Sequence, residues 1–265
     1  MSNHLFSFET AALSDPGLVR EENEDNWFVD ESKGIWLVAD GMGGHTNGKL
    51  ASAKVVECAR TVGFAVSAPD LQARFHDRIL RANGDLLSVA HSTNAVLGST
   101  MVAVLVFGNH LACVWAGDSR AYLIRGGVLH QISRDHTEVQ DLLDKAIIDA
   151  EQARTWPRRN VITRAVGVFD ELELDMVQGQ IEEGDRILLC SDGLTGHVTD
   201  VEIGNALMKP TPSEACQMLV DLTLERGARD NVTVIVLQCH RRGATTVVDG
   251  RTASSYTAGS TEHWP

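Results

Sequence analysis

The chain of 265 residues is 43% hydrophobic, which is enough to bury the core of one large domain. Its formal net charge of -13 argues against binding to nucleic acid, because that function needs a basic face. The same charge would repel a phosphate-bearing ligand, so a site for such a ligand must contain local positive charge from metal ions or arginine.

The cysteines and the apolar runs indicate the compartment. The five cysteines are widely spaced and form no C-x-x-C pair, so we expect a reducing compartment and no zinc–thiolate site. Residues 1–5 lack the features of a signal peptide, and the longest apolar run, Met101–Phe107, is too short to span a bilayer. We therefore predict a cytoplasmic protein that binds neither membrane nor nucleic acid, and we take it to be a monomer.

The first hundred residues predict two strands followed by two helices. Strands are expected at Trp27–Val29 and in the apolar run Ile35–Ala39. Helical spacing of the apolar residues then predicts one helix over about 50–62 and a second over about 71–89.

The rest of the chain is rich in strands. A β-meander is predicted from residue 97 onward, with Gly126-Gly127 as a two-residue hairpin turn. Its runs are apolar on both faces, so we expect a sheet that is covered on both sides. A capping box at Thr211–Glu214 starts a helix that ends before Gly227. The predicted strands are 100–107, 111–115, 121–124, 128–132, 172–178, 186–190 and 232–238.

Clustered strands and paired helices favour an α+β fold with a central antiparallel β-sandwich flanked by pairs of helices, in α-β-β-α order, over a repeating βαβ fold. We expect one domain over residues 1–240 and a flexible C-terminal tail over 241–265, which lacks apolar periodicity. The polar segment of about 135–160 interrupts the pattern and is predicted to be a flap insertion over the sheet edge.

Three aspartates stand between an apolar run and a glycine or asparagine: Asp40, Asp192 and Asp230. Each alone would be ordinary turn chemistry. Together they indicate carboxylates held at strand ends around one site, which suits a hard cation. The acidic run 20–25 would by itself be a solvated face, but beside these aspartates it gains weight as part of the same site. Gly41 is a candidate ligand through its backbone carbonyl, because a glycine lets the backbone come close to an ion.

At this point the chain resembles the metal-dependent protein serine/threonine phosphatases of the type 2C family, in their compact bacterial form. Each matching stretch is weak alone, but the ordered set is specific and spans about residues 14–237. In chain order the stretches are G-L-V-R-E-E-N-E-D at 17–25, V-A-D-G-M-G-G-H at 38–45, G-S-T at 98–100, G-D-S-R at 117–120, D-H-T at 135–137, P-R-R-N-V-I-T-R-A-V-G at 157–167, L-L-C-S-D-G-L at 188–194 and A-R-D-N-V-T-V at 228–234.

The resemblance implies a binuclear Mn²⁺ or Mg²⁺ centre with a weaker third ion, and it leaves the preferred metal open. The implied roles are Asp40 as the bridge between the two ions, Asp192 and Asp230 on the first ion, the Gly41 carbonyl on the second, Glu24 and Asp25 mainly through metal-bound waters, Asp118 on the third ion, and Arg20 on the substrate phosphate.

The implied reaction is in-line attack on phosphorus by a hydroxide that bridges the two ions, without a covalent phosphoenzyme. The proton for the leaving alkoxide would come from His45 or from a metal-bound water, because Met42 stands where animal relatives have a histidine. The substrates would be phosphorylated proteins made by a bacterial serine/threonine kinase, in general signalling or in control of type VI secretion. The alternatives are a catalytically silent binding or regulatory module and a small-molecule phosphoester hydrolase.

Two features of the flap carry open interpretations. Asp135 and His136 could form a catalytic dyad, but we favour a role in capping the helix that follows Arg134. Trp156 stands where bacterial relatives often carry histidine, and it could contact a partner or pack the flap onto the sheet.

Overall fold

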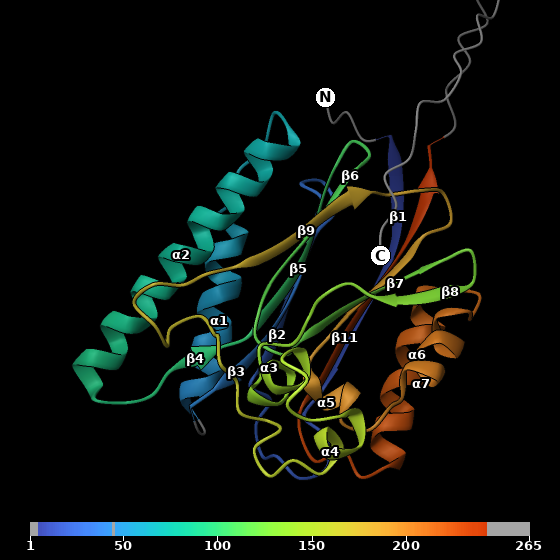
Figure 1. The fold of residues 1–265 in the computed structure, drawn as a ribbon. Coiled ribbons are helices and arrows are strands. Elements are labelled where there is room, and N and C mark those ends of the chain that lie inside the picture. The colour runs from blue at the N-terminus through green and yellow to red at the C-terminus, as the bar shows by residue number, and fades with distance from the viewer. Residues whose placement is uncertain (1–4, 44–45, 243–265) are drawn as a thin grey trace, which may run out of the picture.

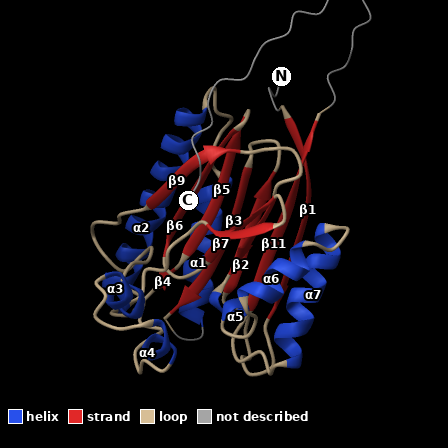
Figure 2. Ribbon diagram, turned by 45° about the vertical axis from the view of Figure 1, so that its right-hand side comes forward, coloured by secondary structure: helices blue, strands red, loops and turns tan. Residues whose placement is uncertain are grey.

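The computed structural model describes residues 5–43 and 46–242. Two antiparallel sheets form the centre of the fold, and helices cover both outer faces (Figure 1). The same layers are visible after a 45° turn, with α1 and α2 beside one sheet and α6 and α7 beside the other (Figure 2). The predicted α+β sandwich with flanking helix pairs is therefore confirmed.

The strands divide between the two sheets in a non-sequential order. One sheet has the order β1-β11-β10-β7-β8, and its strands are β1 (Phe6–Asp15), β11 (Val232–Arg241), β10 (Arg186–Cys190), β7 (Arg120–Arg125) and β8 (Val128–Gln131). The other has the order β2-β3-β5-β6-β9, with β4 paired to β3, and its strands are β2 (Asp25–Asp30), β3 (Ile35–Met42), β5 (Met101–Phe107), β6 (His110–Ala116), β9 (Asp175–Gln180) and β4 (Gly98–Ser99).

The helices fall into three groups. Two long helices pack on the sheet that contains β3, two cover the sheet that contains β11, and three short ones follow the ends of strands β8 and β10. In chain order they are α1 (Thr46–Arg60), α2 (Ala68–Thr93), α3 (Glu138–Asp144), α4 (Ala150–Arg154), α5 (Asp192–Thr195), α6 (Asp200–Leu207) and α7 (Pro212–Glu225). The predicted capping box of α7 is present, with Thr211 accepting from the Glu214 amide.

Alternation along the strands explains why the predicted runs are apolar on both faces. In β3, Trp36 enters the core between the two sheets, whereas Leu37 enters the core under α1 and α2. In β10, Leu189 lies between the sheets and Leu188 packs under α6 and α7. Successive side chains point to opposite faces, and here both faces are buried. The fold therefore has three apolar layers, which fix the strand ends rigidly.

Most predicted elements are confirmed within a few residues, and the hairpin turn is confirmed in detail. Arg125 pairs with Val128 across Gly126 and Gly127, whose φ angles of 57° and 82° favour glycine. The strand predicted at 172–178 is β9 at Asp175–Gln180. Four elements were not predicted: β1, β4, α5 and α6.

In the segment predicted to be a flap, one detail of the prediction is wrong. The segment holds α3 and α4, and its base is closed by a bridge between Thr137 and Ile162. Asp135 does not cap α3, because Thr137 does so by accepting from the Gln140 amide. Asp135 instead pairs with Arg120, a partner in β7 that local sequence cannot reveal.

Two further observations concern the ends and the surface of the fold. Trp156 donates its indole hydrogen to Glu138, a contact within the flap at 3.4 Å. In the described part of the chain, no helix is both long and apolar enough to cross a membrane. β11 runs to Arg241, one residue past the predicted domain end, and the predicted tail from 243 onward lies outside the described residues.

Candidate metal centre

Five of the predicted ligand residues meet at one end of the sandwich, and we call them the acidic centre. They are Asp25 at the start of β2, Asp40 in β3, Asp118 between β6 and β7, Asp192 at the start of α5 and Asp230 just before β11. Both sheets thus contribute. The carboxyl of Asp40 feels the charges of all four others, so strand ends that are distant in sequence converge on it.

Two of these carboxylates face each other directly. Asp25 and Asp40 are cross-strand partners in the antiparallel pair of β2 and β3. Like charges in directly opposite positions destabilise a sheet. A pair that only supported the fold would therefore be unfavourable, and the arrangement indicates that a cation binds between or beside them.

At the glycines after Asp40 and Asp192, another segment of backbone comes so close that no side chain would fit. A Cβ on Gly41 would lie 2.0 Å from the carbonyl oxygen of Gly48 in the first turns of α1. A Cβ on Gly193 would lie 1.8 Å from the carbonyl oxygen of Asn231. Neither glycine has a positive φ, so these Asp-Gly pairs are not the turns that their composition alone would indicate.

Hydrogen bonds that the sequence analysis did not predict position the acidic residues. The hydroxyl of Ser191 donates to Oδ2 of Asp25 at 2.7 Å. The Asn231 side chain accepts from the Glu24 amide at 2.8 Å and donates to the carbonyls of Pro16 and Glu22. Both residues adjoin a predicted ligand in the sequence, and that adjacency is the signal that would have found them.

A second set of bonds connects Asp40 with the turn that carries Asp118. The Asp40 amide donates to the hydroxyl of Thr100 at 3.2 Å, and the Thr100 amide donates to the Asp40 carbonyl at 2.8 Å. The hydroxyls of Thr100 and Ser119 are 2.7 Å apart. The G-S-T and G-D-S-R stretches therefore act as one support under the acidic centre.

Burial and mutual repulsion disfavour the charged form of these carboxylates. Burial, and then the charges of Asp192 and Asp230, raise the pKa of Asp25 to about 7. Burial and the charge of Asp192 raise the pKa of Asp118 to about 8. The same causes raise the pKa of Asp40 well above its ordinary value. Deprotonating all of them together requires nearby cations.

The donor set fits hard divalent cations such as Mn²⁺ or Mg²⁺. Oδ1 of Asp25 and Oδ1 of Asp118 are buried and have no hydrogen-bond partner among the described atoms. A buried oxygen of this kind is costly unless a cation or water satisfies it. The described residues contain no ready cage of three acidic, histidine or cysteine side chains around one point. The fit therefore rests on the all-oxygen donor set and on these two oxygens.

Comparison with known proteins gives the family. The model of protein phosphatase 2C matches residues 12–144, and the model of stage II sporulation protein E matches residues 144–240. The serine/threonine phosphatase stp of Listeria monocytogenes is 34% identical over 235 residues, which cover 85% of this chain and 93% of that protein. The chain belongs to the protein phosphatase 2C family.

Two further members of the family are similar in sequence and structure. Serine/threonine protein phosphatase PstP of Mycobacterium tuberculosis is 40% identical over 85% of this chain, and the chain spans 44% of the length of that protein. A crystal structure of the PstP catalytic domain with two manganese ions superposes with a TM-score of 0.81, at 36% identity over 89% of this chain and 99% of that one. The structure of PppA, described as a key regulatory component of the type VI secretion system in Pseudomonas aeruginosa, superposes with a TM-score of 0.82. The two chains are 40% identical over 88% of this chain and 97% of that one.

Arg20 lies at the edge of the acidic centre. Its guanidinium donates to Oδ2 of Asp230 at 2.7 Å, and its side chain is 52% exposed. The bond to Asp230, followed by that residue's charge, raises the pKa of Arg20. The Asp230 side chain is itself 42% exposed, so this ion pair lies at the open edge of the acidic centre. The predicted general acid, His45, lies outside the described residues.

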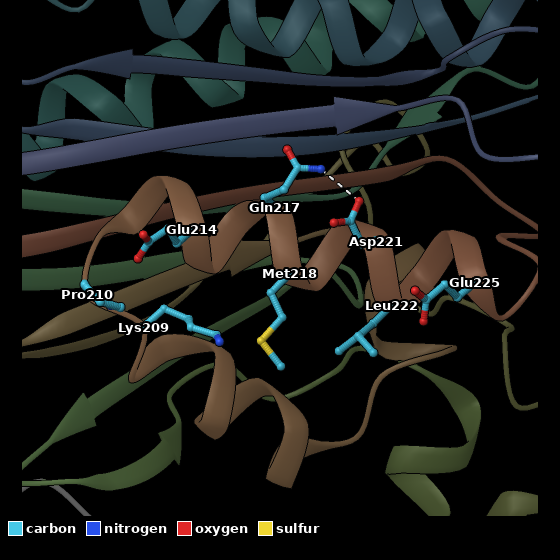
Figure 3. A pocket seen from close by; sticks show the side chains of 8 residues that line it. All are labelled: Lys209, Pro210, Glu214, Gln217, Met218, Asp221, Leu222 and Glu225. Atoms are coloured by element: carbon cyan, nitrogen blue, oxygen red, sulfur yellow. Dashed lines mark hydrogen bonds between the residues drawn. The ribbon is translucent and has the colours of Figure 1, made fainter.

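Other features of this phosphatase 2C member are separate from the acidic centre. Burial raises the pKa of the Cys190 thiol to about 12, so it is not a nucleophile. A surface groove of about 530 Å³ lies along α7, and its lining side chains include Met218 and Leu222 (Figure 3). Neither this groove nor the two hollows beside β7 and β8 include an aspartate of the acidic centre.

Proposed function

We propose that this protein is a metal-dependent protein serine/threonine phosphatase that hydrolyses phosphoserine and phosphothreonine in other proteins. The observation that carries the proposal is the acidic centre itself: five aspartates from both sheets, two of them buried with an unsatisfied oxygen, beside one half-exposed arginine. The names of PstP and stp, which are serine/threonine phosphatases, support the same activity.

The aspartates would hold the metal ions. Asp40 would be the ligand common to two ions, and the charges of all four other aspartates acting on its carboxyl support this role. Asp192 and Asp230 would bind the first ion, the Gly41 carbonyl the second, Asp118 a weaker third, and Glu24 and Asp25 would act mainly through water. Mn²⁺ or Mg²⁺, when bound, lowers the pKa of water and offsets negative charge on the phosphoryl group.

Arg20 would bind the substrate phosphate. Its planar guanidinium can meet two phosphate oxygens at once, and its present partner Asp230 is itself a proposed metal ligand. Asp230 would hold the metal ion, and Arg20 would bind the substrate phosphate in place of its present contact with Asp230. The leaving alkoxide would take its proton from His45 or from a metal-bound water.

The substrates would be proteins phosphorylated by a bacterial serine/threonine kinase. The likeness to PppA makes control of type VI secretion one of two pathways that we propose, and general signalling is the other. All five cysteines are buried free thiols, which suits the proposed cytoplasmic location. We propose that the protein acts as a monomer.

The test is phosphate release from a phosphothreonine peptide, with Mn²⁺ and then with EDTA. We expect turnover that requires metal and falls by about 100-fold or more in Asp192→Asn, because this change keeps the shape and removes a ligand charge. Asp221→Asn, on the outer face of α7, is the matched control and should keep full activity.

The outcomes separate the alternatives. No turnover from folded, Mn²⁺-loaded protein would favour a silent binding module. Turnover of p-nitrophenyl phosphate with none of the peptide would favour a small-molecule phosphoester hydrolase. Loss of folding in Asp192→Asn would make that residue structural, and Asp230→Asn would then test the centre in its place.

A further inference from the structure

His136 is a buried histidine outside the acidic centre, and both of its ring nitrogens are engaged. The Gly117 amide donates to Nδ1 at 3.1 Å, and Nε2 lies 3.1 Å from Oδ2 of Asp175 in β9. The indole of Trp115 stacks on the imidazole, with the ring planes 18° apart. This histidine belongs to the D-H-T stretch, and its neighbour Asp135 binds Arg120, so the two do not form a dyad.

The two contacts fix one protonation form of the ring. A backbone amide can only donate, so Nδ1 must accept and carries no proton. The proton of the neutral ring is therefore on Nε2, which donates to Asp175. A doubly protonated ring would point an N–H at the N–H of Gly117. Burial, and then the charge of Arg164 beside Asp175, oppose that form by lowering the pKa of His136.

The backbone of His136 makes the same connection again. Its amide donates to the Gly117 carbonyl at 2.9 Å, and its carbonyl accepts from the Thr163 amide at 2.8 Å. Thr163 is on the chain that returns from the flap, next to the bridge between Thr137 and Ile162. One residue thus joins the base of the flap, the end of β6 and strand β9.

Gly117 is the residue that this junction holds, and it directly precedes Asp118. Its φ of 111° places it in a conformation that favours glycine, and a Cβ there would lie 2.5 Å from Cβ of Thr100. Asp118 follows with its Oδ1 buried and unsatisfied. Because Asp118 directly follows Gly117, the contacts that hold the Gly117 peptide also position the backbone of Asp118.

We propose that His136 is a positioning residue for Asp118: its unprotonated Nδ1 holds the Gly117 amide and so couples the base of the flap to the acidic centre. This inference rests on the proposed function for the role of Asp118 as a metal ligand. It predicts that the acceptor on the Gly117 side matters more for metal binding than the donor on the Asp175 side.

Two substitutions separate the two ring contacts. His136→Asn keeps an acceptor near the position of Nδ1 and removes the group that reaches Asp175. His136→Gln keeps a donor near the position of Nε2 and removes the acceptor for Gly117. Mn²⁺ binding to each variant is measured by calorimetry and by the metal-induced rise in melting temperature. The same measurements on Asp118→Asn define the part of the binding that depends on Asp118.

We expect His136→Gln to reproduce the loss seen in Asp118→Asn, with about a tenfold weaker affinity for that part of the binding. His136→Asn should stay within about twofold of the unsubstituted protein. Equal effects of the two variants, or the reverse order, would overturn the proposal.

A spectroscopic measurement on the unsubstituted protein tests the proposal without any variant. In the metal-free protein at neutral pH, ¹⁵N NMR of His136 should show a single neutral tautomer with the proton on Nε2. A protonated Nδ1 would overturn the proposal whether or not His136→Gln folds. Neither readout uses turnover, so absence of phosphatase activity would count against the proposed function and leave this test standing.

Discussion

At the scale of single residues, the acidic centre is a set of groups that oppose folding unless a cation is present. Asp25 and Asp40 occupy directly opposite positions in a sheet, and Asp118 has a buried oxygen without a partner. The hydroxyl of Ser191 donates one hydrogen bond to the carboxylate of Asp25. A bond of that kind offsets a small part of the cost of burying a carboxylate. The remainder is offset by bound metal or, without metal, by protonation of the carboxyls, whose pKa values burial raises.

Arg20 gives a prediction at the same scale. Arg20→Ala should raise KM about tenfold or more with a smaller change in kcat, because the phosphate loses its fork of two donors. Arg20→Lys keeps the charge and loses the fork, so it should recover only part of the loss. Steady-state kinetics on the phosphothreonine peptide give both values. An unchanged KM in Arg20→Ala would contradict the assigned role.

At the scale of elements, the predictions that succeeded rest on local signals. The run Ile35–Ala39 and the Gly126-Gly127 turn carry their structure in a few adjacent residues. β1 lacks such a signal, because most of its side chains are only half-buried and its place is set by pairing with β11 along its whole length. α6 is short and contains Gly204, which weakens the helical pattern.

The candidate site divides in the same way. Asp40, Asp192 and Asp230 could be singled out from the sequence because each adjoins an apolar run and a turn residue. Ser191 and Asn231 adjoin two of them and so could be noticed, but the residues that they bind are far away in the sequence and could not be predicted. Asp135 was assigned wrongly for the same reason, since its partner Arg120 is in another element.

The glycines give a prediction for elements. Gly193→Ala would place Cβ 1.8 Å from a backbone oxygen at the junction of α5 and β11, whereas Gly84 in α2 has no atom within 4 Å of an added Cβ. We expect Gly193→Ala to lower the free energy of unfolding by about 2 to 3 kcal/mol. Gly84→Ala should raise it by about 1 kcal/mol. Urea unfolding in EDTA measures both, and similar values for the two variants would refute the close approach.

At the scale of the whole molecule, negative charge lowers stability: the chain has a net charge of -13, and the acidic centre gains further negative charge as the pH rises. Burial raises the pKa of Asp25 to about 7 and that of Asp118 to about 8 in the folded chain, against about 3.9 when unfolded. Between pH 4 and 8 the folded chain therefore holds protons that the unfolded chain has released. Raising the pH in this window favours unfolding.

We expect the metal-free protein to lose about 4 kcal/mol of stability between pH 6 and pH 8. Metal ligands must be deprotonated to bind, so the stabilisation by Mn²⁺ should grow over the same interval. Denaturant unfolding at both pH values, with EDTA and with Mn²⁺, measures the two trends. Asp118→Asn should flatten the metal-free trend, and stability that rises with pH without metal would refute the prediction.

The opposition of Asp25 and Asp40 across two strands has a consequence for how this chain can change. Replacing either aspartate with asparagine would relieve repulsion and make the empty fold more robust, but would weaken the site for which the repulsion exists. Selection for durability and selection for chemistry therefore act in opposite directions on the same two positions. Engineering of more stable variants of this protein should therefore keep both aspartates and introduce substitutions in the outer helices instead.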